Sequence, residues 1–188
     1  MKFKQQLLQM FELSDEQADL IISRFVPEEL SKNELFLEAG KACKKLSFIE
    51  EGICRVFKWT DSKEVTQWIG GEGYFITDLA SFFFDNPANW SIEALTPTKL
   101  WTLNKSDYLD IQQSIPNWNV IEKRFIAKCF MQIEHRVFDF IALSAEERYL
   151  KYFELNKQLF NQVPLQYIAS VLGMSPETLS RIRNKLSS

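Results

Sequence analysis

The stretch "LQYIASVLGMSPETLSRIRNKL", residues 165–186, decides how the fold is interpreted. Its apolar residues share one face in each of two short predicted helices: Ile168 and Leu172, then Leu179, Ile182 and Leu186. Gly173 stands between the helices, and glycine readily adopts the positive φ that ends one helix and lets the next leave at a steep angle. Ser175 is predicted to cap the second helix, with Pro176 at its first position. This spacing predicts a helix-turn-helix.

The outer face of the second helix is polar, as a helix that reads DNA requires. Arginine can donate to guanine O6 and N7, and glutamate can accept from cytosine N4. An αα-hairpin without any nucleic-acid role is the alternative interpretation. The candidate DNA-contacting residues are Gln166, Ser175, Glu177, Thr178, Ser180, Arg181, Asn184 and Lys185.

Upstream of this stretch the sequence contains two further regions that differ in predicted secondary structure. Residues 3–30 are predicted to form short amphipathic helices, with Ser14 and Gln17 as a capping box. Residues 34–103 contain short β-type runs separated by glycine, proline and aspartate, which predict a β-sandwich or barrel rather than βαβ units.

A single long helix is predicted between the β-region and the closing helices. Residues 118–141 contain no Gly or Pro and carry two apolar stripes. One stripe can pack on the barrel, and the other needs a second surface. We expect a partner helix in a symmetric dimer, the alternative being that both stripes lie inside one monomeric core.

Composition and charge restrict the class of protein. Hydrophobic residues make up 46% of the chain and charged residues 25%, a balance typical of a protein that buries a core. Lys and Arg number 22 against 25 Asp and Glu, but from residue 145 onward they exceed the acidic residues by 6 to 4. The modest excess of positive charge therefore lies with the predicted DNA-reading helices.

Few residues in the chain are suited to metal or cofactor chemistry. The three cysteines lack CxxC spacing, and His135 is the only histidine, so metal-dependent enzymes, iron–sulfur sensing and haem sensing are not supported. No nucleophile–base pair or phosphate-binding loop is visible, so we predict no enzyme and no metal site. No apolar run is long enough to span a membrane, and free thiols suit a reduced cytoplasm.

Taken together, these predicted segments make the chain resemble the Crp-Fnr superfamily of bacterial transcription regulators, and most of all its short members found in Bacteroidetes. The resemblance rests on "FIEEGICRVF", "GEGYFITDLASF" followed by "SIEAL", and "IASVLGMSPETLSRIRNKL". It implies an α+β chain with a cyclic-nucleotide-binding-like β-barrel of jelly-roll type over residues 1–116, a long dimerisation helix over 117–142 and a helix-turn-helix DNA-binding domain over 143–188. Relatives place an arginine where this chain has Pro176, so its operator is expected to differ.

The region where cyclic-nucleotide-binding relatives hold the ligand departs from their pattern. Their Gly-Glu pair falls on Thr77 and Asp78, and their Arg-Ser or Arg-Thr pair on Ala88 and Asn89, and no Arg or Lys lies between Leu79 and Leu95. A cyclic phosphate needs such a cationic partner. We therefore expect no response to cyclic AMP, no cofactor and an effector of unknown identity. The candidate pocket residues are Tyr74, Thr77, Asp78, Asn89 and Ser91, beside a cavity or core predicted from Tyr74, Phe75, Phe82, Phe83, Phe84 and Trp90.

The function expected from these features is that of a cytoplasmic, homodimeric regulator of transcription. Its expected partners are double-stranded DNA with an inverted-repeat site, a second copy of the chain and, for an activator, RNA polymerase; no membrane is involved. The alternative is a sensor or protein-interaction module with weak or no DNA binding, which the small number of cations on the last helix leaves open.

Overall fold

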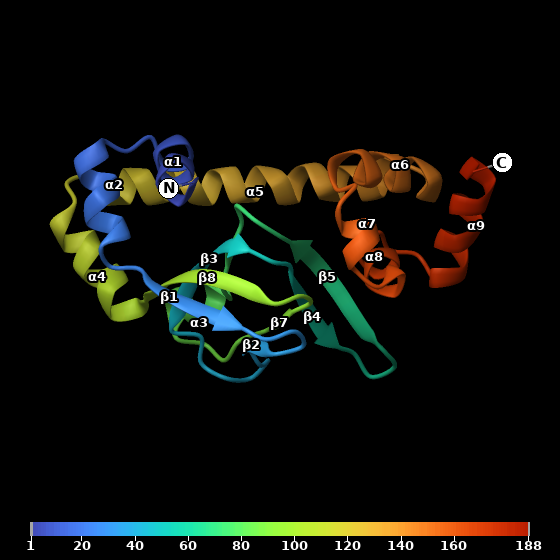
Figure 1. Ribbon diagram of the computed structural model, residues 1–188, viewed down its shortest axis with the longest axis horizontal. Helices are drawn as coiled ribbons and strands as arrows, with labels where there is room; N and C mark the ends of the chain where they lie inside the picture. Colours follow the sequence, from blue (N-terminus) through green and yellow to red (C-terminus); the bar gives the residue numbers. More distant parts are fainter. Residues whose placement is uncertain (1, 188) are drawn as a thin grey trace.

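The computed structural model describes residues 2–187 of the 188-residue chain. Within these residues two helices precede the strands, and the remaining helices follow them, apart from the short α3 (Figure 1). The helices are α1 Lys2–Phe11, α2 Asp15–Ile22, α3 Leu79–Phe84, α4 Lys105–Ser114, α5 Trp118–Ala142, α6 Ala145–Leu155, α7 Leu159–Gln162, α8 Leu165–Val171 and α9 Pro176–Ser187. The strands are β1 Val26–Leu30, β2 Leu35–Leu37, β3 Lys45–Glu51, β4 Cys54–Trp59, β5 Glu64–Gly70, β6 Phe75–Ile76, β7 Ser91–Ala94 and β8 Thr98–Asn104.

The strands form two antiparallel four-stranded sheets packed face to face, as predicted. One sheet has the order β1-β8-β3-β6 and the other β2-β7-β4-β5. Side chains from both inner faces are buried between them, including Phe36, Ile49, Ile92 and Leu100. The architecture is the predicted jelly-roll sandwich, because alternate residues of each strand turn toward one shared core.

The first strand corrects the prediction that residues 3–30 are all helical. The helices end at Ile22, and Val26–Leu30 forms β1, which pairs with β8 in the register Val26 opposite Thr102. Local sequence did not indicate this strand because its stability comes from pairing with residues about 70 positions away. Pro27 is tolerated because β1 is an edge strand of its sheet.

Gly52 makes the tight turn between β3 and β4 possible. Its φ is +102°, and a Cβ at this position would lie 2.4 Å from Thr98 Oγ1 and 2.7 Å from the carbonyl oxygen of Pro97. Only glycine fits both the conformation and the space, so Gly52 lets the chain pass by a tight turn from β3 in one sheet to β4 in the other.

Helix α5 is the element that joins the two ends of the molecule. Figure 1 shows it with α1, α2 and α4 beside its first turns and α6 to α9 grouped at its far end. Its observed bounds match the predicted long helix. Its first turns are covered, since Trp118 is buried and Ile121 and Phe125 pack against the cluster formed by α1, α2, α4 and the outer face of the first sheet.

The C-terminal helices pack on the edge of the second sheet. The backbone N–H of Thr66 in β5 donates to Ser170 Oγ in α8 at 2.8 Å. The Arg55 guanidinium lies between the rings of Phe57 and Tyr167, 4.0 and 3.9 Å from their centroids. Ile53, Ile69 and Leu95 of the sandwich share a buried cluster with the side chains of α8 and α9. The sandwich and the closing helices therefore form one continuous body.

Candidate DNA-binding surface and ligand site

The turn between α8 and α9 has the geometry expected from its sequence. Gly173 has a φ of +65°, and the N–H of Met174 donates to the carbonyl oxygen of Ala169 at 3.0 Å. Ala169 is fully buried. A Cβ at Gly173 would lie 2.5 Å from a ring carbon of Phe140 in α5, so glycine here also allows α5 to pack against the turn.

Helix α9 begins at Pro176, and Ser175 precedes it. The Ser175 hydroxyl accepts a hydrogen bond from the Thr178 N–H at 3.2 Å, which satisfies one of the free donors at the start of the helix. Leu179 and Ile182 are buried as predicted. Leu186 is 44% exposed, which corrects the expectation that it turns inward: the last turn of α9 runs beyond the cluster that buries the other two.

The outer face of α9 is open and polar. A shallow hollow at the surface is lined by Pro176, Glu177, Ser180, Arg181 and Asn184. The pKa of Glu177 is lowered by a hydrogen bond from the Ser175 hydroxyl, so the carboxylate is kept ionised beside the start of the helix. In this hollow the Glu177 carboxylate can accept hydrogen bonds and the Arg181 guanidinium can donate them.

The remaining candidate DNA-contacting residues lie around this hollow rather than in it. Ser175 and Thr178 are engaged in the helix cap, at 3.3 Å between their hydroxyl oxygens. Lys185 Nζ pairs with Glu146 Oε2 of α6 at 2.7 Å, and Gln166 is exposed on α8. The structure thus brings together four of the eight candidates, namely Glu177, Ser180, Arg181 and Asn184.

Asp78 occupies the centre of the predicted ligand region. This residue is 3% exposed, and its carboxylate accepts hydrogen bonds from three backbone N–H groups: Ser81 at 2.9 Å, Asn89 at 2.8 Å and Trp90 at 3.2 Å. Asp78 is the N-cap of α3, so the carboxylate also lies at the positive end of this short helix. These donors are of the kind that binds an anion, and the chain's own carboxylate already uses them.

The other four candidate pocket residues are engaged locally and do not converge on one open site. Thr77 Oγ1 donates to the carbonyl oxygen of Lys45 at 3.0 Å, and Ser91 Oγ accepts from the Ala39 N–H at 3.0 Å. Tyr74 is 45% exposed and packs edge-on against Trp68. The Asn89 side chain is exposed, and its backbone serves Asp78.

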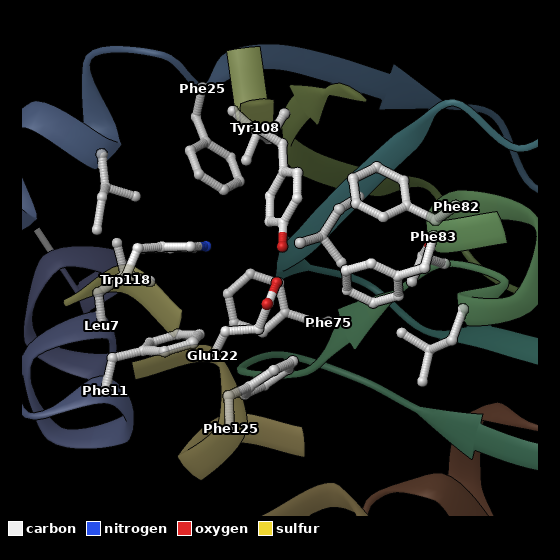
Figure 2. Close-up of a pocket in the computed structure, with 15 residues that line it drawn as sticks. Leu7, Phe11, Phe25, Phe75, Phe82, Phe83, Tyr108, Trp118, Glu122 and Phe125 are labelled. Carbon is white, nitrogen blue, oxygen red and sulfur yellow. The ribbon is translucent and has the colours of Figure 1, made fainter. Parts of the chain in front are cut away.

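An apolar cavity of about 50 Å³ lies elsewhere, between the helical cluster and the outer face of the first sheet (Figure 2). Phe75, Phe82 and Phe83 line it as expected of the aromatic set, together with Thr77, whereas Phe84 is 75% exposed. Phe84 was placed in the set by its sequence neighbours, but α3 turns consecutive residues to different sides.

Sequence reasoning missed the polar residues of this cavity. Tyr108 comes from α4, and Trp118 and Glu122 come from α5. Nothing in the local sequence marks them, because the cavity is assembled from helices and strands far apart in the chain. Burial raises the pKa of Glu122.

Beyond its first turns α5 exposes a row of large apolar side chains. Ile126, Phe130, Ile133, Val137 and Phe140 follow one another at alternating intervals of four and three residues, and Phe130 and Ile133 are 64% and 57% exposed. This spacing is that of a coiled-coil seam. Isolated exposed apolar residues are common on proteins, but a continuous row along one helix is not.

Within residues 2–187 no group of three or more His, Cys, Asp or Glu side chains is arranged to hold a metal ion. His135 is exposed on α5. The same residues include no helix with the length and apolar character needed to cross a membrane.

Comparison with known proteins agrees with this architecture. Residues 27–114 match the cyclic nucleotide-binding domain family. The Thermus thermophilus catabolite activator protein has 21% identity and a TM-score of 0.60, with 95% of this chain and 86% of that chain covered. The Xanthomonas campestris regulator CLP, described as responsive to c-di-GMP, has 14% identity and a TM-score of 0.72 over 93% and 92% of the two chains. FixK2 from Bradyrhizobium japonicum has 14% identity and a TM-score of 0.70, covering 87% and 84%. No curated protein gave a significant match.

The sandwich therefore has the fold of a cyclic nucleotide-binding domain, the family whose model residues 27–114 match. With the long helix and the closing helices, the chain has the fold of the Crp/Fnr-type regulators, as the sequence resemblance indicated. The matched residues fall within the predicted sensor domain of residues 1–116.

Proposed function

We propose that this chain is a DNA-binding transcription regulator that acts as a homodimer, reads a two-fold-related site through α9 and does not respond to cyclic AMP. The observation that carries the proposal is the outer face of α9, where Glu177, Ser180, Arg181 and Asn184 line one open surface while Leu179 and Ile182 hold the inner face in the core. A helix presented in this way can enter a major groove with acceptors and donors facing the base edges.

The homodimer is supported by the exposed row on α5. A second copy of α5 packed along Ile126, Phe130, Ile133, Val137 and Phe140 would bury side chains that are otherwise in water. The charge of one α9 is small, so a single copy would bind DNA weakly. Pairing two copies doubles the contacts and makes the protein match the two-fold symmetry of an inverted repeat.

The absence of a cyclic AMP response is supported by Asp78. Its carboxylate takes the backbone donors of Ser81, Asn89 and Trp90 that a cyclic phosphate would need. A phosphate would have to displace a buried carboxylate and would gain no arginine in exchange. We expect the melting temperature to be unchanged by about 1 mM cyclic AMP, where a ligand well above its Kd would raise it; a rise of several degrees would overturn this part of the proposal.

The experiment that tests the whole proposal is selection from a random pool of double-stranded DNA. We expect an inverted repeat whose half-site centres lie about 10 base pairs apart, bound with a log–log salt slope of about −0.9 per phosphate contacted. If the dimer enriches no motif, the chain is better described as a sensor or interaction module.

Substitution of Arg181 separates base reading from simple attraction to phosphate. Arg181→Ala should relax the preference at one position of each half-site by roughly 1 to 3 kcal/mol, measured by competition between single-base variants of the selected site. Lys157→Ala removes a positive charge away from the hollow and serves as the control. An equal loss for all sequences in Arg181→Ala would show that Arg181 contacts phosphate alone.

A further inference from the structure

The cavity of about 50 Å³ between the helical cluster and the first sheet presents an entirely apolar surface. Tyr108, Trp118 and Glu122 line it with carbon atoms, since no polar atom is accessible within it. Thr77 also lines it, but its hydroxyl group is used in the hydrogen bond to the carbonyl oxygen of Lys45 at 3.0 Å. A buried water needs several polar partners, so this cavity does not hold an ordered water.

Aromatic rings around the cavity hold one another in place. Phe82 meets Phe83 and Tyr108 edge-on, with ring centroids 5.4 and 5.2 Å apart, and Phe11 stacks on Phe125 at 4.9 Å. Figure 2 shows these two groups of rings on different sides of the space. Methionine, which fills irregular gaps in protein cores, is not among the lining residues, all of which belong to the described part of the chain. The surrounding side chains therefore do not close the space themselves.

Leu79 provides a short route between the cavity and solvent. It lines the cavity from the first position of the short helix α3, and its side chain is 45% exposed. Exposed side chains change rotamer within about nanoseconds, so a small molecule can enter past Leu79 without unfolding of α3.

We propose that this cavity binds a small hydrocarbon, a molecule without a hydrogen-bonding group. An apolar cavity of roughly 150 Å³ takes up benzene, so a cavity of about a third of that volume suits a molecule of about two to four carbon atoms. Such a molecule supplies the dispersion contacts that rings facing an empty space lack. The site goes beyond the proposed DNA-binding function and does not depend on it.

Polar and charged molecules do not fit this surface. A hydroxyl group inside the cavity would lose its hydrogen bonds to water and gain none in exchange. An ion would lose far more, since no polar atom is accessible to it there. The cage of backbone donors around Asp78 is a separate site, because Asp78 is not among the lining residues.

The test uses the full chain labelled with ¹³C in its isoleucine methyl groups and two probes of similar size, propane and ethanol. Ile21 lines the cavity, and Ile21→Val identifies its NMR signal. We expect propane to shift this signal in a saturable manner and to bind more tightly than ethanol by about tenfold or more, because the ethanol hydroxyl would be buried without a partner. The signal of Ile141, which is 79% exposed, is the internal control and should not shift with propane.

A cavity-filling substitution tests where propane binds. Leu103 lines the cavity from β8 and is buried, so Leu103→Phe places additional ring carbons in the space. We expect propane to lose its effect on Ile21 in this variant and to keep it in Leu35→Phe, a control at a half-exposed position on β2. If Leu103→Phe does not fold, Leu46→Phe on the neighbouring strand β3 makes the same test.

The absence of a saturable propane shift in the wild-type chain would overturn the proposal, as would equal affinities for propane and ethanol. A propane shift that survives the filling substitution, or that affects the exposed Ile141 equally, would also overturn it. No DNA is present in this test, so its failure is distinct from a failure of the proposed function.

Discussion

Asp78 has a structural role at the start of α3. The carboxylate, the N-terminus of α3 and the backbone before β7 form a closed set of hydrogen bonds. The same donors offered to a ligand would make an anion site. With Asp78 present, they hold α3 and the start of β7 together.

Asp78→Ala is therefore expected to destabilise the sandwich by about 3 kcal/mol, because three backbone N–H groups, one buried and two partly buried, lose a charged acceptor. Urea unfolding followed by tryptophan fluorescence measures this change. Asp61→Ala, in an exposed turn, is the control and should change the unfolding midpoint little. A loss in Asp78→Ala as small as that of the control would contradict the structural role.

Glu122 gives a prediction about pH. Burial raises its pKa in the folded state, so the folded chain holds the proton more tightly than the unfolded chain, and stability falls as pH rises from the ordinary pKa of glutamate to the raised one. Glu122→Gln removes this loss. The melting temperatures of variant and wild type should agree below about pH 4 and diverge by pH 7, with the variant higher.

The matched control for this comparison is Glu134→Gln, an exposed position on the same helix. Its melting temperature should follow that of the wild type across the same range. A constant difference between Glu122→Gln and the wild type at every pH would mean that packing, and not ionisation, is responsible.

At the scale of elements, α5 has two parts with different environments. Its first turns are covered by α1, α4 and the sandwich, while its middle and end present a seam to solvent. The rest of the described chain leaves this seam largely uncovered, since Phe130, Ile133 and Val137 are each more than half exposed. A second copy is the simplest partner with a matching surface.

Ile133→Glu should convert the proposed homodimer to a monomer, because it places a charge in the middle of the seam. Sedimentation velocity measures the change in mass. Gln132→Glu introduces the same charge one residue away, off the 4-3 spacing, and should leave the dimer intact. A dimer that survives Ile133→Glu would place the interface elsewhere on the chain.

At the scale of the whole molecule, the position of α9 depends on how α8 rests on the sandwich. The Thr66 N–H points out from the free edge of β5 and donates to Ser170 in α8. Arg55 ties the same surfaces together, since it pairs with Glu64 and Glu93 and lies against Tyr167. An edge strand is thus covered by the helix that precedes the turn to α9.

Ser170→Ala should loosen this contact without unfolding either part. The Thr66 amide would lose its acceptor, and its hydrogen exchange should become roughly tenfold faster while the amides in the centre of β4 keep their protection. Ser180→Ala, on the exposed face of α9, is the control. Unchanged exchange at Thr66 would mean that the docking does not depend on this hydrogen bond.

Much of the architecture could be predicted from local pattern. The bounds of α5, the tight turn at Gly173 and the start of α9 at Pro176 follow from helix periodicity, glycine conformation and capping, which act over a few residues. The exposed candidates on α9 were found in the same way, because an amphipathic helix has only one outer face.

Other features were decided by the tertiary structure alone. Strand β1 exists because β8 lies beside it, and the Asp78 carboxylate has three backbone donors because the chain before β7 returns to α3. Trp118 and Glu122 lie in one cavity with Tyr108 because five helices and a sheet enclose it. The sequence by itself determined the helices and their faces, whose causes are local. The contacts between residues distant in the chain were visible only in the tertiary structure, because the pattern of a short stretch does not specify which distant residues it will contact.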